Sequence, residues 1–199
     1  MTELWKIENE IYESGYTLLC GVDEAGRGPL AGPVCAAACT LPRGMDIPGL
    51  NDSKKLSEKK REELYDIITD RALCFGVAFA EVEEIEEYNI LNATFLAMNR
   101  ALAQLSPVPE LALIDGNRAK GIALPARCIV KGDASCADIA AASVLAKVTR
   151  DRLMLKMAEL YPQYHFEQHK GYGTKLHYEA LREFGPSPIH RMSFLKKLH

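Results

Sequence analysis

The sequence lacks the patterns that mark membrane, secreted and disulfide-stabilised proteins. Its 199 residues contain no apolar run long enough to span a bilayer, and residues 1–16 are polar and mixed in charge, unlike a secretory signal. Its six cysteines form no C-x-x-C pair, so we interpret them as small buried side chains in a reducing compartment rather than metal ligands or a disulfide set. These absences lead us to expect a cytoplasmic protein with no membrane partner.

Several motifs of familiar enzyme classes are also missing. The chain has no G-x-x-x-x-G-K-[ST] phosphate loop and no G-x-S-x-G nucleophile elbow. Gly26, Gly28 and Gly32 weakly suggest a dinucleotide fingerprint, but prolines and a following strand stand where that motif needs a helix. His165 and His169 have the spacing of helical metal ligands without an H-E-x-x-H pattern, and we expect both to face solvent.

Charge is spread unevenly along the chain. The net charge of −3 argues mildly against a nucleic-acid partner. However, five glutamates lie within residues 81–87, which we interpret as a solvated helical face, whereas residues 184–199 contain no acid and include Arg191, Lys196 and Lys197. Local sign matters more than the total when a phosphate backbone is the partner.

Hydrophobic periodicity and turn residues predict an α/β protein. Predicted strands cover residues 18–22, 34–41, 73–80, 111–114 and 126–130. Predicted helices cover residues 4–16, 58–71, 90–105, 135–160 and 174–184. The first three strands suit antiparallel neighbours and the last two need crossovers, so we expect a mixed five-stranded sheet flanked by helices, with a C-terminal helical extension.

One stretch, residues 21–34, carries groups that packing does not require. Asp23 and Glu24 are adjacent carboxylates at the end of the first predicted strand, and Arg27 follows between two glycines. Glycine and proline weaken a strand, and acids are almost never fully buried unless they are paired. These local costs indicate an active-site loop.

Acidic residues also follow two later strands. Asp115 comes at the end of the fourth strand and Asp133 just after the fifth. Sites in open α/β sheets form at strand ends, so these acids can converge with Asp23 and Glu24. Converging carboxylates repel one another unless a divalent cation binds them, and oxygen ligands favour Mg²⁺ or Mn²⁺. Each aspartate alone is better explained as a turn or cap residue; together they favour a metal site.

Other polar residues leave two interpretations open. Ser143, Lys147 and Asp151 are four apart on one helical face, which suits either a surface ion-pair row or contacts to phosphates near the metals. Tyr172, between two glycines, suits either packing on a sugar or base or a turn that covers the core. Lys54 lies in a polar loop before the second predicted helix.

With these residues, the sequence resembles the ribonuclease HII family. The resemblance runs in order from about residue 20 to residue 194. It is carried by residues 22–34, 52–56, 114–116, 131–133, 141–147 and 169–174. The first of these blocks is highly specific, and the others are strong jointly. Because few residues precede the first block, we expect ribonuclease HII rather than the sister family, ribonuclease HIII, which has a long N-terminal substrate-binding domain.

The resemblance implies a ribonuclease H-like fold and an activity. The implied enzyme is a Mn²⁺- or Mg²⁺-dependent endonuclease that cleaves RNA in RNA–DNA hybrids, and we expect the chain to act as a monomer. It also cuts on the 5′ side of single ribonucleotides in duplex DNA, leaving 5′-phosphate and 3′-hydroxyl ends, which links it to ribonucleotide excision. On this basis residues 1–160 are the catalytic domain, and residues 161–199 are the C-terminal helical extension packed on it.

The resemblance also implies residue roles. Asp23, Glu24, Asp115 and Asp133 hold the metals and carry catalysis. The substrate-binding residues are Gly26, Arg27 and Gly28 at the 2′-hydroxyl, Tyr172 on the adjacent sugar, and Lys54, Ser143 and Lys147 at phosphates. Two other hypotheses remain at this level: a non-catalytic nucleic-acid-binding module, suggested by the basic tail, and a small-molecule phosphatase that uses the same acids.

Overall fold

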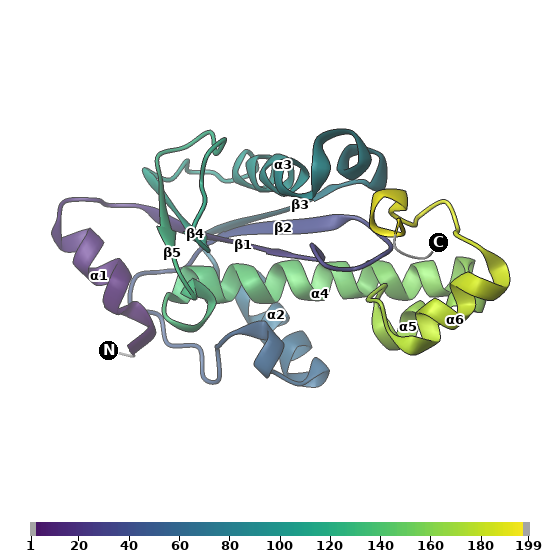
Figure 1. Ribbon diagram of the computed structural model, residues 1–199. Coiled ribbons are helices and arrows are strands. Elements are labelled where there is room, and N and C mark those ends of the chain that lie inside the picture. The colour runs from purple at the N-terminus through teal and green to yellow at the C-terminus, as the bar shows by residue number, and fades with distance from the viewer. Residues whose placement is uncertain (1–2, 197–199) are drawn as a thin grey trace.

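The computed structural model, which describes residues 3–196, is built on one five-stranded sheet with the strand order β3-β2-β1-β4-β5 (Figure 1). The strands are β1 (Leu19–Ala25), β2 (Val34–Thr40), β3 (Cys74–Ala80), β4 (Leu111–Asp115) and β5 (Ala126–Ile129). β1, β2 and β3 pair antiparallel, whereas β1, β4 and β5 run parallel. The predicted mixed α/β sheet is confirmed.

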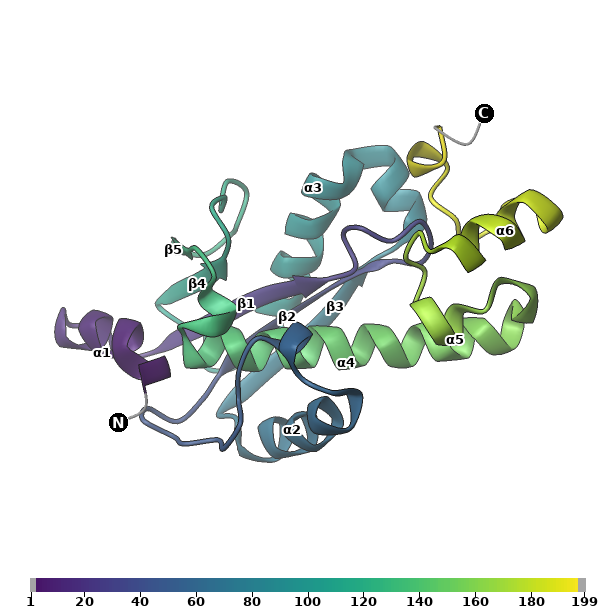
Figure 2. The same cartoon turned by 60° about the horizontal axis from the view of Figure 1, so that its bottom comes forward.

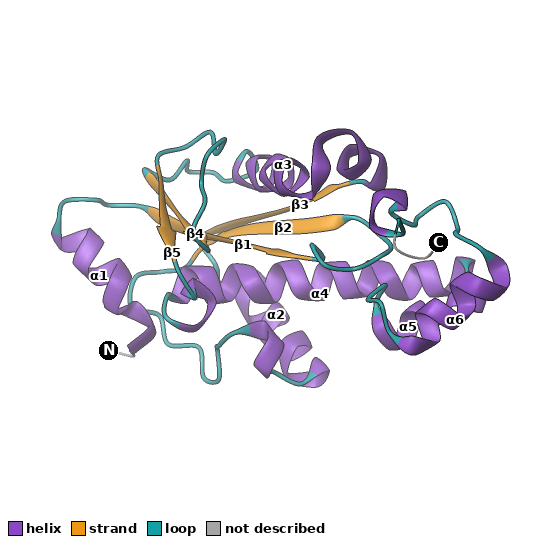
Figure 3. Ribbon diagram, viewed as in Figure 1, coloured by secondary structure: helices purple, strands orange, loops and turns teal. Residues whose placement is uncertain are grey.

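Helices cover both faces of this sheet. The helices are α1 (Lys6–Glu13), α2 (Glu58–Arg71), α3 (Val82–Leu102), α4 (Ala137–Leu160), α5 (Phe166–His169) and α6 (Lys175–Phe184). Figure 3 shows α3 on one side of the strands and α4 with α2 on the other. No helix within residues 3–196 is long and apolar enough to cross a membrane.

Side chains on the two faces of the central strands pack into two separate hydrophobic cores. Successive side chains of a strand point to opposite faces. Accordingly, Leu19 of β1 packs in the layer with α4, while its neighbours Cys20 and Val22 pack in the layer with α3. Every residue of β2 is buried, because both of its faces are covered. This burial explains why these strands read as continuous apolar runs.

Helix α4 lies close to the sheet because small residues meet there. Ala140, Ala141 and Ala142 are fully buried on α4. Opposite the start of the helix, a Cβ atom added to Gly21 would stand 2.1 Å from the backbone of Asp138. The glycine therefore permits a backbone-to-backbone approach that no other residue allows at this position.

Helix α3 begins earlier than the apolar pattern predicts. It starts at Val82, inside the run of glutamates, and has non-helical angles at Asn89 (φ 66°, ψ 163°). The side chain of Asn89 accepts hydrogen bonds from the backbone N–H groups of Leu91 and Asn92, so it caps the second half of the helix. The clear periodicity begins at this internal cap, which is why the sequence predicts a start at residue 90.

The chain after α4 forms a third small core. Its buried members include Leu30, Met154, Phe166 and Leu181, so the extension packs on the loop after β1 and on α4. The four-residue helix α5 was not predicted, because it is too short to show a period. The division of the chain at residue 160 stays a prediction, and Lys197 of the basic tail lies outside the described residues.

All six cysteines are free, as predicted. Cys20, Cys35, Cys39 and Cys136 are buried, whereas Cys74 and Cys128 are partly exposed. Burial raises the pKa of the Cys39 and Cys136 thiols well above the ordinary value, so these groups are unreactive at neutral pH.

The contact between β1 and α4 predicts a stability loss in Gly21→Ala. The new methyl group must push the start of α4 away from the sheet, which should cost roughly 3 kcal/mol of unfolding free energy. Gly44→Ala is the control, since Gly44 has φ 75° but open space around it, and should cost only about 1 kcal/mol. Urea unfolding measures both; equal losses would contradict the close approach.

Candidate metal centre

Three of the four predicted acids converge at one edge of the sheet. Asp23 lies in β1, Asp115 ends β4, and Asp133 lies in the short 3₁₀ helix Gly132–Ala134 after β5. One carboxylate oxygen from each lies within 4.8 Å of the others. Because β1, β4 and β5 are parallel neighbours, their carboxyl ends meet at the same edge.

Glu24 is not a member of this group of three. It follows Asp23 directly in β1, and adjacent side chains of a strand point to opposite faces. Its Oε1 atom lies 3.2 Å from Nη1 of Arg27. Glu24, Arg27 and Asp115 nevertheless line one cavity of about 380 Å³. Glu24 therefore borders the acid cluster from the side of that cavity.

The cluster carries unfavourable charge in the absence of a cation. Asp23 is 2% exposed, and its pKa is raised well above the ordinary value, first by burial and then by the charges of Glu24 and Asp115. The pKa of Asp133 is also raised, by burial and by Asp115. A divalent cation would reverse this penalty, and the all-oxygen donor set fits Mg²⁺ or Mn²⁺.

The backbone around the acids holds them in place. Oδ1 of Asp115 accepts a 2.7 Å hydrogen bond from the N–H of Gly132, which ties the end of β4 to the turn that carries Asp133. Lys131 enters this turn in the left-handed region (φ 58°). Oδ1 of Asp23 accepts a 2.7 Å bond from the N–H of Glu24. The cluster is thus built largely from local turns at adjacent strand ends.

Two predicted substrate-binding residues lie directly against the acids. The Nζ atom of Lys54 is 3.6 Å from Oδ2 of Asp133, although the lysine side chain is 70% exposed. Ser143 is buried on α4, with its Oγ atom 2.8 Å from Oγ of Ser53. Its hydroxyl also lowers the pKa of Asp23 by hydrogen bonding. Ser143 therefore favours the ionised form of Asp23 as well as lying near the cluster.

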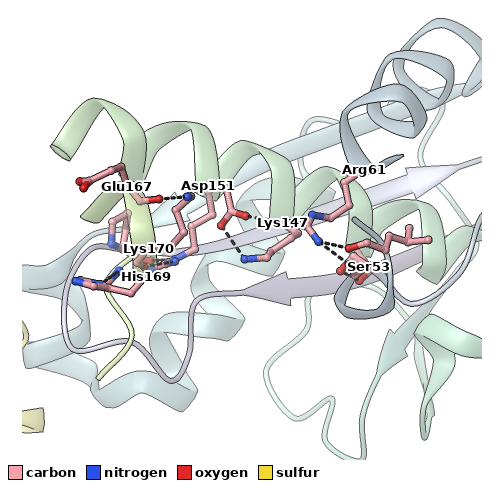
Figure 4. A network of polar contacts seen from close by, with 12 residues as sticks. Ser53, Arg61, Lys147, Asp151, Glu167, His169 and Lys170 are labelled. Carbon is pink, nitrogen blue, oxygen red and sulfur yellow. Dashed lines mark hydrogen bonds and ion pairs between the residues drawn. The ribbon is translucent and has the colours of Figure 1, made fainter. Parts of the chain in front are cut away.

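Lys147 belongs to a short polar network on α4. Its Nζ atom donates a 2.8 Å hydrogen bond to Oδ1 of Asp151, and Nη2 of Arg61 lies 3.8 Å from the other oxygen of that carboxylate (Figure 4). Arg61 also donates to the backbone carbonyl of Ser53 at 3.2 Å. Burial lowers the pKa of Lys147. The ion pair between Lys147 and Asp151 is compatible with both interpretations of this helical face, a surface ion-pair row or a set of contacts to phosphates.

The remaining predicted residues surround a second cavity. It has a volume of about 760 Å³ and is lined by Gly26, Arg27, Gly28, Lys54, Lys147 and Tyr172, among others. Tyr172 is 43% exposed, and a Cβ atom added to Gly28 would meet its ring at 3.7 Å. Glu24 lines this cavity and the first one, so the two meet at the acid cluster.

The histidines behave differently from the prediction. His169 was expected to face solvent, but it is buried, and its Nε2 atom lies 2.8 Å from the carbonyl oxygen of Tyr164. The expectation is wrong because the short helix α5 turns this face toward the core. His165, at 44% side-chain exposure, is partly open to solvent.

A hydrogen-bonded chain of histidines ends at Tyr172. The N–H of Ser187 donates to Nδ1 of His190 (2.9 Å), the Nε2 atoms of His190 and His177 lie 3.0 Å apart, and Nδ1 of His177 lies 2.9 Å from the carbonyl oxygen of Tyr172. Only neutral rings satisfy every link, with His190 donating to His177 and His177 to Tyr172. Sequence reasoning missed this chain, because single histidines carry no spacing signal.

Comparison with known proteins gives a consistent answer. A family model described as ribonuclease HII matches residues 20–197. The chain is 54% identical over 194 residues to a ribonuclease HII of Endomicrobium trichonymphae, with 97% of this chain and 92% of the relative covered. It is 52% identical over 191 residues to a ribonuclease HII of Clostridioides difficile, covering 96% and 75%.

A solved structure has the same architecture. The structure of ribonuclease H2 from Pyrococcus horikoshii matches with a TM-score of 0.75 at 26% sequence identity, covering 92% of this chain and 97% of that one. The agreement extends over nearly the whole of both chains, and it bears out the expected ribonuclease H-like fold.

The charge at the cluster predicts that Asp23→Asn stabilises the metal-free protein. The repulsion is fully present above the raised pKa of Asp23 and is relieved as pH falls through it. In EDTA at pH 8 we expect the variant to melt at least about 2–4 °C higher, which corresponds to 1 kcal/mol. Mn²⁺ should raise the melting temperature of the unmutated protein and have little effect on the variant.

Asp46→Asn is the control for that experiment, because Asp46 is exposed and far from the cluster in the sequence. It should melt like the unmutated protein with and without Mn²⁺. Equal stabilisation of all three proteins by Mn²⁺ would place the ion elsewhere.

The histidine chain predicts a loss of stability in weak acid. Burial lowers the pKa of His177 and His190 to about 4, whereas both take up protons near pH 6.5 in the unfolded chain. The stability contributed by the neutral pair is therefore present above pH 6.5 and lost as pH falls toward 4, by about 2 kcal/mol per histidine at pH 5.

Urea unfolding at pH 7 and pH 5 checks this prediction. The control is His165→Gln, which changes a partly exposed histidine of the same extension. Its unfolding free energy should depend on pH as that of the unmutated protein does. Imidazole NMR signals of His177 and His190 that titrate near pH 6.5 in the folded protein would contradict it.

Proposed function

The chain belongs to the ribonuclease HII family of endoribonucleases, which cleave the RNA of RNA–DNA hybrids, and we propose that it also cuts 5′ of single ribonucleotides embedded in duplex DNA. The observation that carries the proposal is the convergence of three carboxylates beside a cavity that contains the Gly26–Arg27–Gly28 loop and Tyr172. Family membership favours this activity over a non-catalytic binding module or a small-molecule phosphatase.

The acids are proposed to hold Mn²⁺ or Mg²⁺. Asp23, Asp115 and Asp133 supply converging oxygens, and Glu24 borders them. Two bound ions would supply Lewis-acid charge that activates a water and stabilises the leaving oxygen of the phosphodiester. The protein's part is to orient the carboxylates at one place, and the Glu24 and Gly132 amides hold those of Asp23 and Asp115.

Cations and a hydroxyl beside the acids are proposed to bind the phosphates of the cleaved strand. Lys54 is largely exposed and lies 3.6 Å from Asp133, so its ammonium group can turn toward an incoming phosphate. Lys147 and Ser53 line the larger cavity, and Ser143 is hydrogen-bonded both to Ser53 and to Asp23. Sequence-independent contacts of this kind fix the register of the strand without reading its bases.

Recognition of the ribonucleotide is proposed to come from the loop and the tyrosine. The 2′-hydroxyl is the group that separates RNA from DNA, and it can donate and accept hydrogen bonds. Gly26 and Gly28 let the backbone approach a sugar closely, and Arg27 lines the same cavity. The ring of Tyr172, which lies over Gly28, offers a flat surface to the adjacent sugar.

The products and setting follow from this chemistry. Attack of water on the phosphorus with loss of the 3′ oxygen leaves a 5′-phosphate and a 3′-hydroxyl, the ends that a ribonucleotide excision pathway in DNA can process. We further propose that the enzyme acts as a monomer in the cytoplasm.

The direct test is incubation with a DNA duplex that carries one ribonucleotide. We expect a single nick 5′ of that nucleotide only with Mn²⁺ or Mg²⁺, and no cut in the matched all-DNA duplex. Asp23→Asn should slow cleavage by at least about 10³-fold, as is usual when one member of a catalytic unit is removed. Asp46→Asn is the matched control and should cut normally. Metal-independent nicking, or turnover retained in Asp23→Asn, would overturn the proposal.

A further inference from the structure

Arg191 is a buried cation whose guanidinium donates hydrogen bonds to backbone carbonyls of one loop and lies over the ring of Phe194, 5.2 Å from its centroid. It is fully buried. Its Nε donates to the carbonyl oxygen of Gly32 (2.9 Å), Nη1 to those of Arg27 (3.0 Å) and Pro29 (2.9 Å), and Nη2 to that of Gly26 (2.6 Å). Within residues 3–196 it forms no ion pair with a carboxylate. All four bonds thus end on residues 26–32.

A second buried arginine holds the rest of the same loop. Arg150 of α4 is 1% exposed. It donates to the carbonyl oxygens of Ala31 (3.1 Å), Pro33 (3.0 Å) and Lys170 (3.0 Å). A Cβ atom added to Gly26 would stand 1.9 Å from Nε of Arg150, so the loop lies directly on this side chain.

Burial of these two arginines carries a desolvation penalty, which indicates that the geometry of the loop has a functional role. The pKa of Arg191 falls to about 9, first because of burial and then because of the charge of Arg150. Burial also lowers the pKa of Arg150. Two like charges are thus kept together in the interior, and their direct hydrogen-bond partners are backbone carbonyls rather than carboxylates. Apolar side chains of similar volume would fill this space with less desolvation.

The main chain around Arg191 pairs with the loop as well. The N–H of Arg191 donates to the carbonyl of Leu30, and the N–H of Gly32 donates to that of Ile189, both at 2.8 Å. The N–H of Leu30 donates to the carbonyl of Gly171 at 2.8 Å. Figure 2 shows this yellow C-terminal segment beside the loop that joins β1 to β2.

The carbonyl bonds decide which way two amides face. In a planar trans peptide the C=O of one residue and the N–H of the next point in opposite directions. Because the carbonyls of Gly26 and Arg27 point to Arg191, the N–H groups of Arg27 and Gly28 point away from it. Neither N–H has a hydrogen-bond partner within the described part of the chain, and both residues line the cavity with Tyr172.

We infer that Arg191, assisted by Arg150, is a positioning residue for recognition of the ribonucleotide. By drawing the carbonyls of residues 26–29 inward, it presents the amides of Arg27 and Gly28 to the 2′-hydroxyl oxygen of the bound ribonucleotide. This inference rests on the proposed function. It adds that the recognition surface is set by a residue more than 160 positions later in the chain, which does not touch the substrate.

Arg191→Lys is the discriminating variant, because lysine keeps the charge but cannot reach four carbonyls from a single nitrogen. Steady-state cleavage of a duplex with one ribonucleotide gives KM and kcat, and inhibition by the matched all-DNA duplex gives Ki. We expect KM to rise at least about tenfold, the size of one lost charged hydrogen bond. The Ki of the all-DNA duplex and the Mn²⁺ concentration for half-maximal rate should stay within about twofold.

Arg100→Lys is the matched control. Arg100 also donates to a carbonyl, that of Phe79, and pairs with Glu84, but it contacts no residue of the loop. It should lower the melting temperature without changing KM or Ki. All assays are run below the start of the melting transition of each variant.

The outcomes separate the inference from the proposed function. If the unmutated enzyme leaves the duplex with one ribonucleotide uncut, the proposed function fails. If it prefers the ribonucleotide duplex and folded Arg191→Lys keeps that preference, Arg191 is merely structural and the inference fails. Should Arg191→Lys not fold, Arg150→Lys carries the same test, with a smaller rise in KM expected and an unchanged KM overturning the inference.

Discussion

The repulsion between carboxylates that the sheet forces together is the constraint on which this structure depends. Because β1, β4 and β5 are parallel and adjacent, the sheet holds the carboxylates of Asp23, Asp115 and Asp133 close together. Burial of Asp23 then removes the water that would screen the charges. An arrangement of this kind is unfavourable for the protein alone and becomes favourable with a bound cation, which supports our proposal that the acids form a metal site.

Beneath the loop after β1, in contrast, buried charge is compensated by hydrogen bonds within the protein. Arg150 and Arg191 are compensated by seven carbonyl contacts in total, all made by the chain itself. This half of the site is complete without any ligand. The two groups of buried charge thus differ in what compensates them: the acids lack counter-charges among themselves, whereas the arginines have their carbonyl partners within the chain.

Much of this could be predicted from the sequence, for identifiable reasons. The strands were predictable because sheets covered on both faces require continuous apolar runs, as in β2. The acids were noticed because a buried strand that ends in Asp23 and Glu24 breaks the packing pattern. Where the signal was local, the boundary was also predicted: the helix expected over residues 58–71 is α2, and the side chain of its N-cap Ser57 accepts a hydrogen bond from the N–H of Lys60. The start of α3 was missed because Asn89 interrupts the helix, and the burial of His169 because α5 has no period.

The sequence by itself determined the element types, the strand ends that carry acids, and the family, since each of these depends on residues close together in the chain. Only the tertiary structure decided that Glu24 stands beside the group of three acids rather than within it, because that depends on strand alternation and on Arg27. It alone placed Arg191 under the loop at residues 26–32. A long-range hydrogen bond leaves no periodic or local trace in a sequence, so such contacts become visible only when the chain has folded.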